Sequence, residues 1–185
     1  MSASLLTVSL TGDLTEARTD KDIYIKNLNN TDYLRLGAMF AGNTISVTSE
    51  KGFRMSSANS AIAESFINAG KELELNTNAT TGTVGEAGNP IRILNDRATV
   101  NIAAQSAYIR GMGSISLGVQ NGTLVLGNIN TQGEFVAESD GSLAVGREEE
   151  KNSTGMVEKE AVEGSVKTGG NATLSAADSL TLDGT

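Results

Sequence analysis

The 185-residue chain contains no cysteine, no histidine and no tryptophan, and only one proline. Without histidine there is no Ser-His-Asp or Cys-His arrangement, and without cysteine there is no thiolate nucleophile and no zinc site of the usual ligand set. Catalysis by carboxylate, lysine, tyrosine or hydroxyl groups is the chemistry that remains. We therefore assign no catalytic, cofactor-binding or metal-binding residue from the sequence, and we expect a protein that is not an enzyme.

Large aromatic side chains and positive charge are also scarce. The chain has four Phe and three Tyr, and a net charge of −8 with a pI near 4.6. An acidic chain with few rings for base stacking is a poor partner for phosphate backbones, so we expect no nucleic acid ligand. No stretch approaches 18 apolar residues, which predicts no membrane insertion, and the first residues lack the basic start and apolar run of a signal peptide.

A short apolar, polar, apolar triplet recurs through most of the chain. Its period of two is typical of a half-buried β-strand. The eleven triplets are IYI at 23–25, LRL at 34–36, ISV at 45–47, FRM at 53–55, LEL at 73–75, IRI at 91–93, VNI at 100–102, ISL at 115–117, LVL at 124–126, LAV at 143–145 and LTL at 180–182.

The spacing of the triplets predicts stacked coils. Intervals of 22 residues (Ile23 to Ile45), 19 (Leu34 to Phe53), 20 (Phe53 to Leu73) and 24 (Ile91 to Ile115, Val100 to Leu124) are typical of a solenoid with coils of about 18 to 24 residues. Gly, Asn, Ser and Asp between the triplets suit the corners. We predict an all-β, right-handed parallel β-helix, whose narrow interior explains the scarcity of aromatics. The alternative is an antiparallel β-sandwich.

Two segments interrupt the triplet pattern, and they define the boundaries of the predicted domains. We expect β-helix coils over 1–146, with a glycine-rich excursion at 78–90 that closes at Pro90. Residues 147–163 are densely charged and are expected to form an inserted loop or short surface helix, with disorder, before a coil resumes at 164–185.

Several phrases resemble the repeats of large bacterial secreted exoproteins. These are AGNTISVTSEKG, NAGKELELNTNA, NGTLVLGNINTQGEF, SDGSLAVG, GNATLSAADSLTLDGT and GTVGEAGNPIRI, the last from Gly82 to Ile93. The resemblance is to the filamentous haemagglutinin-like and autotransporter adhesins, and it covers residues 20–146 and 164–185. It implies a right-handed parallel β-helix, a secreted or cell-surface location, and an internal piece of a longer protein, because the family's secretion motifs are missing.

The resemblance implies a structural or adhesive passenger, a rigid stalk whose outer side chains make multivalent contacts with host or bacterial surface glycans or proteins. Two other functions remain open. One is a β-helical carbohydrate-active enzyme, a polysaccharide lyase or glycosidase that uses acidic residues from adjacent coils. The other is an intracellular β-helix that polymerises by stacking its coil ends.

The candidate surface sites are modest. Asp20 with Asp22, and Glu72 with Glu74, are spaced to face one side of a strand, and we expect solvated surface residues. Arg92, Asp96 and Arg97 form a basic cluster expected to make surface ion pairs. No calcium-binding repeat is present. Acceptor sequences for N-glycosylation occur at Asn29, Asn78, Asn121, Asn152 and Asn171.

We also expect a ladder of outward polar side chains that could bind an extended ligand. Its members are Ser46, Thr48, Glu72, Glu74, Asn101, Ser116 and Thr123.

Overall fold

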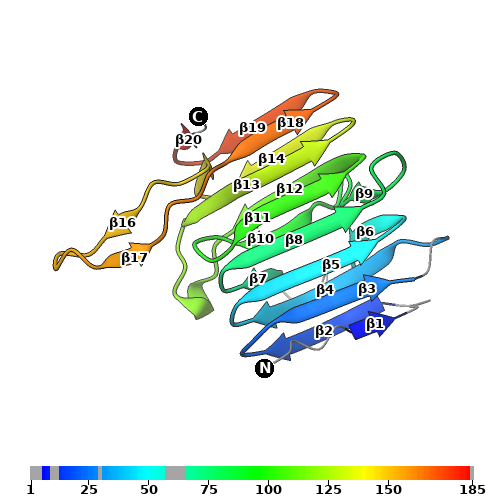
Figure 1. Ribbon diagram of the computed structural model, residues 1–185, viewed down its shortest axis with the longest axis horizontal. Helices are drawn as coiled ribbons and strands as arrows, with labels where there is room; N and C mark the ends of the chain where they lie inside the picture. The colour runs from blue at the N-terminus through cyan, green and yellow to red at the C-terminus, as the bar shows by residue number, and fades with distance from the viewer. Residues whose placement is uncertain (1–5, 9–12, 29–30, 57–65, 184–185) are drawn as a thin grey trace.

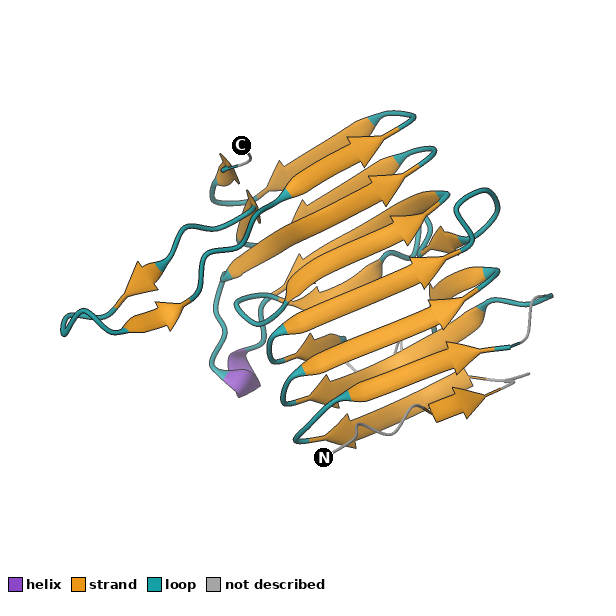
Figure 2. Ribbon diagram, viewed as in Figure 1, coloured by secondary structure: helices purple, strands orange, loops and turns teal. Residues whose placement is uncertain are grey.

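The computed structural model describes residues 6–8, 13–28, 31–56 and 66–183. In this part of the chain nearly all regular structure is β-strand, and one short 3-10 turn, η2 (Ile115–Leu117), lies at a corner. Figure 2 shows this turn beside two layers of strands. The all-β prediction is confirmed.

The strands form two large sheets, which we call sheet A and sheet B. Sheet A contains β1 (Leu6–Val8), β3 (Ile23–Asn27), β5 (Thr44–Ser49), β8 (Glu72–Thr77), β11 (Thr99–Ala104), β13 (Thr123–Thr131), β15 (Ser142–Val145), β18 (Ser165–Thr168) and β20 (Leu180–Leu182). Sheet B contains β2 (Asp13–Thr19), β4 (Leu34–Ala41), β6 (Gly52–Met55), β7 (Ile67–Ala69), β9 (Thr83–Val84), β10 (Ile91–Leu94), β12 (Ser106–Met112), β14 (Phe135–Ser139) and β19 (Ala172–Ala176).

The chain alternates between the two sheets, and each strand pairs with the strand one coil earlier. Among the described residues, all strand pairings within sheets A and B are parallel. In Figure 1 the sheet A strands run one way in front and the sheet B strands return behind as the chain climbs from β2 to β20, which is a right-handed winding. The protein is a parallel β-helix, and the antiparallel sandwich alternative is wrong.

The interior is held in register by columns of apolar side chains. We call each coil of the helix a level. One column in sheet A joins seven levels, and its members are successive strand partners: Ile23, Ile45, Leu73, Val100, Leu126, Val145 and Leu182. A register shift between Val100 and Ile102 gives β13 one extra residue, so that Ile102 still pairs with Ile129. The bulge lets the column through Val100 and the column through Ile102 both continue across a coil of different length.

Sheet B alternates large and small residues in its interior columns. Leu34, Phe53, Val84, Ala107 and Phe135 are successive partners, and all are fully or almost fully buried. Two phenylalanines therefore fit because the two levels between them hold the smaller Val84 and Ala107. This packing explains how a chain with few large apolar residues closes a core.

The predicted spacings are partly right. The pairs Ile23 with Ile45 and Leu34 with Phe53 stack as the intervals of 22 and 19 predicted. Phe53 and Leu73 lie in different sheets, and Val100 pairs with Leu126 rather than Leu124. Several coils are longer than predicted: Ile45 to Leu73 is 28 residues and Leu73 to Val100 is 27.

One predicted strand is wrong. Ile115 and Leu117 lie in η2, and Ile115 is 82% exposed. The partner of Ile91 is Ile109, so the interval of 24 does not describe a coil. The segment ISL has strand-like periodicity, but Gly113 and Gly118 flank it, and Gly118 has a positive φ of 72° that ends the 3-10 turn.

Inserted segments leave the solenoid in the middle of a level. The 78–90 segment contains β9. Strands β9 and β10 pair with different parts of the longer β12. Residues 147–163 emerge where β15 ends and return at β18, and both strands pair with β13. The insert is a β-hairpin of β16 (Glu150–Lys151) and β17 (Val157–Lys159), extended by an Arg147–Val162 bridge, so the alternative of a short surface helix is wrong.

Gly52 is held at a close approach between two levels. Its φ is +113°, and a Cβ there would overlap the carbonyl oxygen of its strand partner Thr83. We expect Gly52→Ala to lower the free energy of unfolding by about 2 kcal/mol, because it adds backbone strain and a clash. Urea denaturation measures this.

Gly88→Ala is the matched control, since a Cβ at Gly88 meets nothing within 4 Å. The control should unfold at the wild-type urea concentration. Equal losses for the two variants would contradict the pairing of β6 with β9.

Candidate functional site

The outer faces of the two sheets differ in chemistry. On sheet A the outward positions of neighbouring strands are mostly small and polar: Ser46 pairs with Glu74, Thr48 with Asn76, and Thr44 with Glu72. Asn101 continues the Glu74 row, as the predicted polar ladder requires. Ser116 lies in η2 instead of on the ladder, and Thr123 is at the start of β13.

The predicted carboxylate pairs lie at the same edge of sheet A, two levels apart, because Ile23, Ile45 and Leu73 are successive strand partners. Glu72 and Glu74 project outward on β8 between buried leucines, and Glu72 accepts a hydrogen bond from the Asn101 amide at 2.8 Å. Asp20 and Asp22 lie in the turn between β2 and β3 rather than on a strand. Asp22 accepts a hydrogen bond from the Thr44 backbone N–H at 3.1 Å, which ties one coil to the next.

Sheet B carries a row of arginines on its outer face, which we call the arginine face. It consists of Arg18 (β2), Arg35 (β4), Arg54 (β6), Arg92 (β10) and Arg110 (β12), one on each of five successive levels. Arg35 is the strand partner of Arg54, and Arg92 is the strand partner of Arg110. Five of the seven arginines of the chain therefore share one face of an acidic protein.

Three of these arginines have carboxylate partners. Arg18 pairs with Glu16, Arg54 Nε lies 3.1 Å from Glu86, and Arg110 Nη2 lies 2.6 Å from Asp140. The Arg54 guanidinium also donates to the Gly85 carbonyl at 2.6 Å and to Thr83 Oγ1 at 2.7 Å. Arg54 is thus part of the structure between β6 and β9.

Aromatic rings accompany the arginines. The guanidinium of Arg54 lies 3.8 Å from the ring centre of Tyr33, and that of Arg18 lies 3.8 Å from the ring centre of Phe40. Tyr108 donates a hydrogen bond to Glu134 at 2.7 Å, and this bond is the main cause that raises the pKa of the Tyr108 hydroxyl. Arginine and tyrosine are the residues that most often anchor binding surfaces.

Arg92 differs from the other members of the face. Its side chain is half-buried, its Nε is buried, and that atom has no hydrogen-bond partner. No ion pair of Arg92 is present among the described residues. Burial lowers the pKa of this guanidinium below its ordinary value. Among the described residues the expected ion pair of Arg92 is not present, and its partner on the next strand is another arginine.

The other two members of that predicted cluster lie apart from the arginine face. Asp96 and Arg97 are exposed in the turn between β10 and β11. Asp96 accepts a hydrogen bond from the Thr123 backbone N–H at 2.7 Å, so it anchors the start of β13.

The predicted glycosylation acceptors are spread over the molecule, and Asn29 lies outside the described residues. Asn78, Asn121 and Asn171 are exposed. Asn152 accepts hydrogen bonds from the Thr154 and Met156 backbone N–H groups, both at 3.0 Å, and so shapes the hairpin turn.

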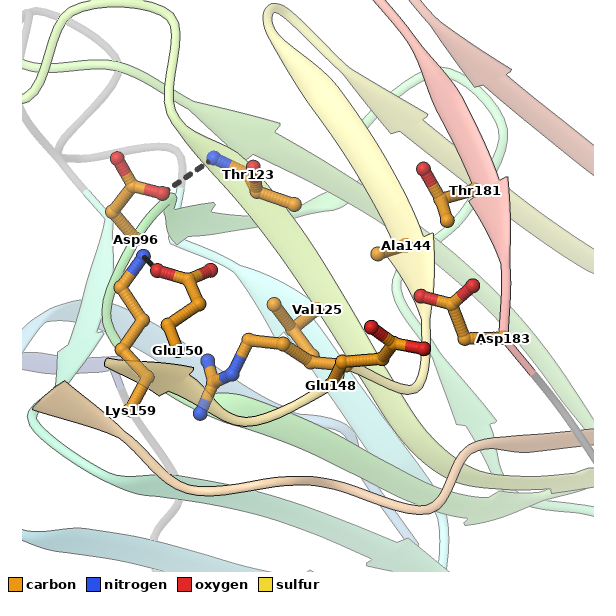
Figure 3. A pocket seen from close by; sticks show the side chains of 10 residues that line it. Asp96, Thr123, Val125, Ala144, Glu148, Glu150, Lys159, Thr181 and Asp183 are labelled. Carbon is orange, nitrogen blue, oxygen red and sulfur yellow. Dashed lines mark hydrogen bonds and ion pairs between the residues drawn. The ribbon is translucent and has the colours of Figure 1, made fainter. Parts of the chain in front are cut away.

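A second candidate site is a groove of about 450 Å³ between the inserted hairpin and sheet A. It is lined by Asp96, Thr123, Val125, Ala144, Arg147, Glu148, Glu150, Lys159, Thr181 and Asp183. Figure 3 shows Glu148 and Asp183 at one end, with Asp96, Glu150 and Lys159 at the other. Lys159 pairs with Glu150 at 3.0 Å, and Arg147 donates to the Glu160 carbonyl at 3.1 Å.

The described residues contain no group of three or more acidic side chains placed to hold a metal ion. In the same part of the chain, no helix has the length and apolar character needed to cross a membrane. Comparisons with protein families, with curated proteins and with solved structures found no match to this chain.

The arginine face was missed at the sequence level although a signal was present. In LRL, FRM and IRI the middle residue is arginine, and all three triplets lie in sheet B. The triplets of sheet A have other residues in the middle position, such as Tyr24, Ser46 and Glu74. Sorting the triplets by their central residue separates the two sheets.

Arg54 and Arg92 give a direct comparison of a bonded and an unbonded arginine. We expect Arg54→Met to lower the free energy of unfolding by about 2 kcal/mol, because it removes charge-assisted hydrogen bonds and leaves carbonyls without a donor. Arg92→Met should change it by less than about 0.5 kcal/mol or raise it, because a desolvated charge is removed. Urea unfolding of both variants measures this, and an equally large loss for Arg92→Met would show a structural partner.

Proposed function

We propose that this chain is a rod-forming segment of a bacterial secreted or cell-surface exoprotein of the adhesin type, and that its arginine face makes multivalent contacts with surface glycans or proteins. The observation that carries the proposal is one arginine on each of five successive levels of sheet B. The register places them in separate columns, with Arg35 beside Arg54, Arg92 beside Arg110, and Arg18 beside Phe40. Adjacent levels of a β-helix are about 4.8 Å apart, so the solenoid holds these charges at fixed positions on one face.

The rod supplies the stiffness that such contacts require. Long-range pairing joins each level to the next in both sheets, and the apolar columns run through the same levels. Side chains on a rigid support lose less conformational freedom when they bind, and repeated weak contacts add up.

The face can be tested with two charge-matched variants. One carries Arg35→Gln, Arg92→Gln and Arg110→Gln, and the other carries Lys26→Gln, Lys71→Gln and Lys167→Gln, which lie on sheet A or at a corner. Both remove three positive charges, so a difference between them reports position rather than net charge. Binding is measured on an array of host and bacterial surface glycans and on fixed cells.

We expect the arginine variant to bind at least tenfold more weakly than the wild type, with the lysine variant unchanged. Circular dichroism melts check that both variants remain folded. Equal binding by the two variants, or no binding by the wild-type chain, would contradict an adhesive arginine face.

A second candidate function is a carbohydrate-active enzyme, and the hairpin groove favours it. Glu148 and Asp183 line this groove, both are exposed, and neither side-chain carboxylate has a hydrogen-bond or ion-pair partner among the described residues. Paired carboxylates beside a bound sugar are the groups that glycosidases use.

If this second function holds, the wild-type chain will release reducing ends from a panel of polysaccharides, and Glu148→Gln will lower that rate at least a hundredfold. Glu138→Gln is the control, since Glu138 lies on sheet B outside the groove. No reducing ends from the wild-type chain, or equal rates in all three proteins, would remove the enzymatic alternative.

A further inference from the structure

Arg92 is the one arginine of the face that the described residues show as half-buried, without an ion pair and with an unpartnered buried nitrogen. It lies on β10 between the buried Ile91 and Ile93, so its side chain leaves the sheet on the outer face. A desolvated guanidinium without a partner is costly, because it loses hydration and gains no hydrogen bond in return.

On the next level, the described residues place an arginine rather than a carboxylate beside Arg92. The strand partner of Arg92 is Arg110, and Asp140 bonds to Arg110 with two contacts, 2.6 Å from Nη2 and 3.1 Å from Nε. Asp140 is therefore committed to the neighbouring arginine. Arg92 and Arg110 are partners on adjacent strands, and Asp140 lies on the level beyond Arg110, just after β14.

A planar guanidinium is matched by an acceptor with two oxygens on one atom. Carboxylates and sulfates have this geometry and accept two parallel hydrogen bonds. The surrounding charge limits which of these ligands can approach. The chain has a net charge of −8, and Glu134, Glu138 and Asp140 lie on or beside the next strands. This surface repels a densely charged polyanion more strongly than a ligand with a single negative group.

The surface near Arg92 suits a polar ligand. The apolar residues Phe66, Leu94 and Val119 form a small cluster on sheet B, but all three are buried. None of the large exposed hydrophobic residues of the described chain lies on a strand of sheet B. A protein partner usually needs an exposed apolar anchor, while a glycan is held by charge and hydrogen bonds.

We propose that Arg92, with Arg110 beside it, binds the carboxylate of an acidic sugar within an otherwise neutral glycan. This inference rests on the proposed adhesive function and names its ligand class. The carboxylate gives the Arg92 guanidinium an ionic partner and leaves Asp140 on Arg110.

The test titrates 3′-sialyllactose, lactose and sodium acetate into the folded chain and follows the arginine Nε–Hε signals by NMR. We expect 3′-sialyllactose to shift the Arg92 signal in a saturable way, and lactose to leave it unchanged. Arg92→Met should abolish saturable binding, and Arg92→Lys should weaken it at least tenfold because the paired hydrogen bonds are lost. Arg97→Met is the control, since Arg97 is exposed in the adjoining turn, and it should bind like the wild type.

Three results would overturn the inference. They are no binding of 3′-sialyllactose, binding of acetate with equal affinity, and sialyllactose binding that survives Arg92→Met. If the array experiment with the arginine variant still shows lost binding, the adhesive face stands and only the role of Arg92 fails. Array binding that depends on Arg92 but appears only on protein ligands would instead assign the site to a protein carboxylate and overturn the glycan.

Discussion

The structure depends on the parallel hydrogen-bonded pairing of each coil with the next. The strands of sheets A and B have no hairpin partner among the described residues, so their backbone groups are satisfied by strands that are 19 to 28 residues away in most of the pairings. Because the strands in a column must stay in register, the chain adjusts its length elsewhere. It uses a bulge in β13 and inserts at 78–90 and 147–163, while the apolar columns stay continuous.

The same constraint fixes what each outer face can display. Side chains alternate inward and outward along a strand, so the residue between two interior residues always faces solvent. Stacking then places equivalent residues of successive coils in a line. On sheet A this produces a polar surface of Ser, Thr, Asn and Glu, and on sheet B it produces the arginine face. A surface of this kind needs no pocket, because the spacing of the levels itself positions the charges.

Much of the fold could be predicted from the sequence, because period-two triplets indicate strands that are buried on one side. Ten of the eleven triplets lie on strands, and ISL at 115–117 is the exception. The missed strands have few large inward residues: Ala107 and Gly111 flank Ile109 on β12, and Ala172 and Ala176 flank Leu174 on β19. Such residues carry little hydrophobic signal, although stacking makes them good interior residues. The candidate site was harder to predict, because the strand partner of Arg92 depends on which coils are adjacent. The intervals between triplets alone did not give the order of the coils.

The most direct measurement of the central claim is disulfide formation between cysteines introduced into a chain that has none. Arg92→Cys with Arg110→Cys joins outward positions that are strand partners, about 4.8 Å apart, which is close enough for a disulfide. Arg92→Cys with Glu138→Cys joins positions two levels apart, about 9.6 Å, which is too far. The account predicts a disulfide in the first protein under mild oxidation and none in the second. A disulfide in the second protein alone, or in neither, would contradict the stacked order of β10, β12 and β14.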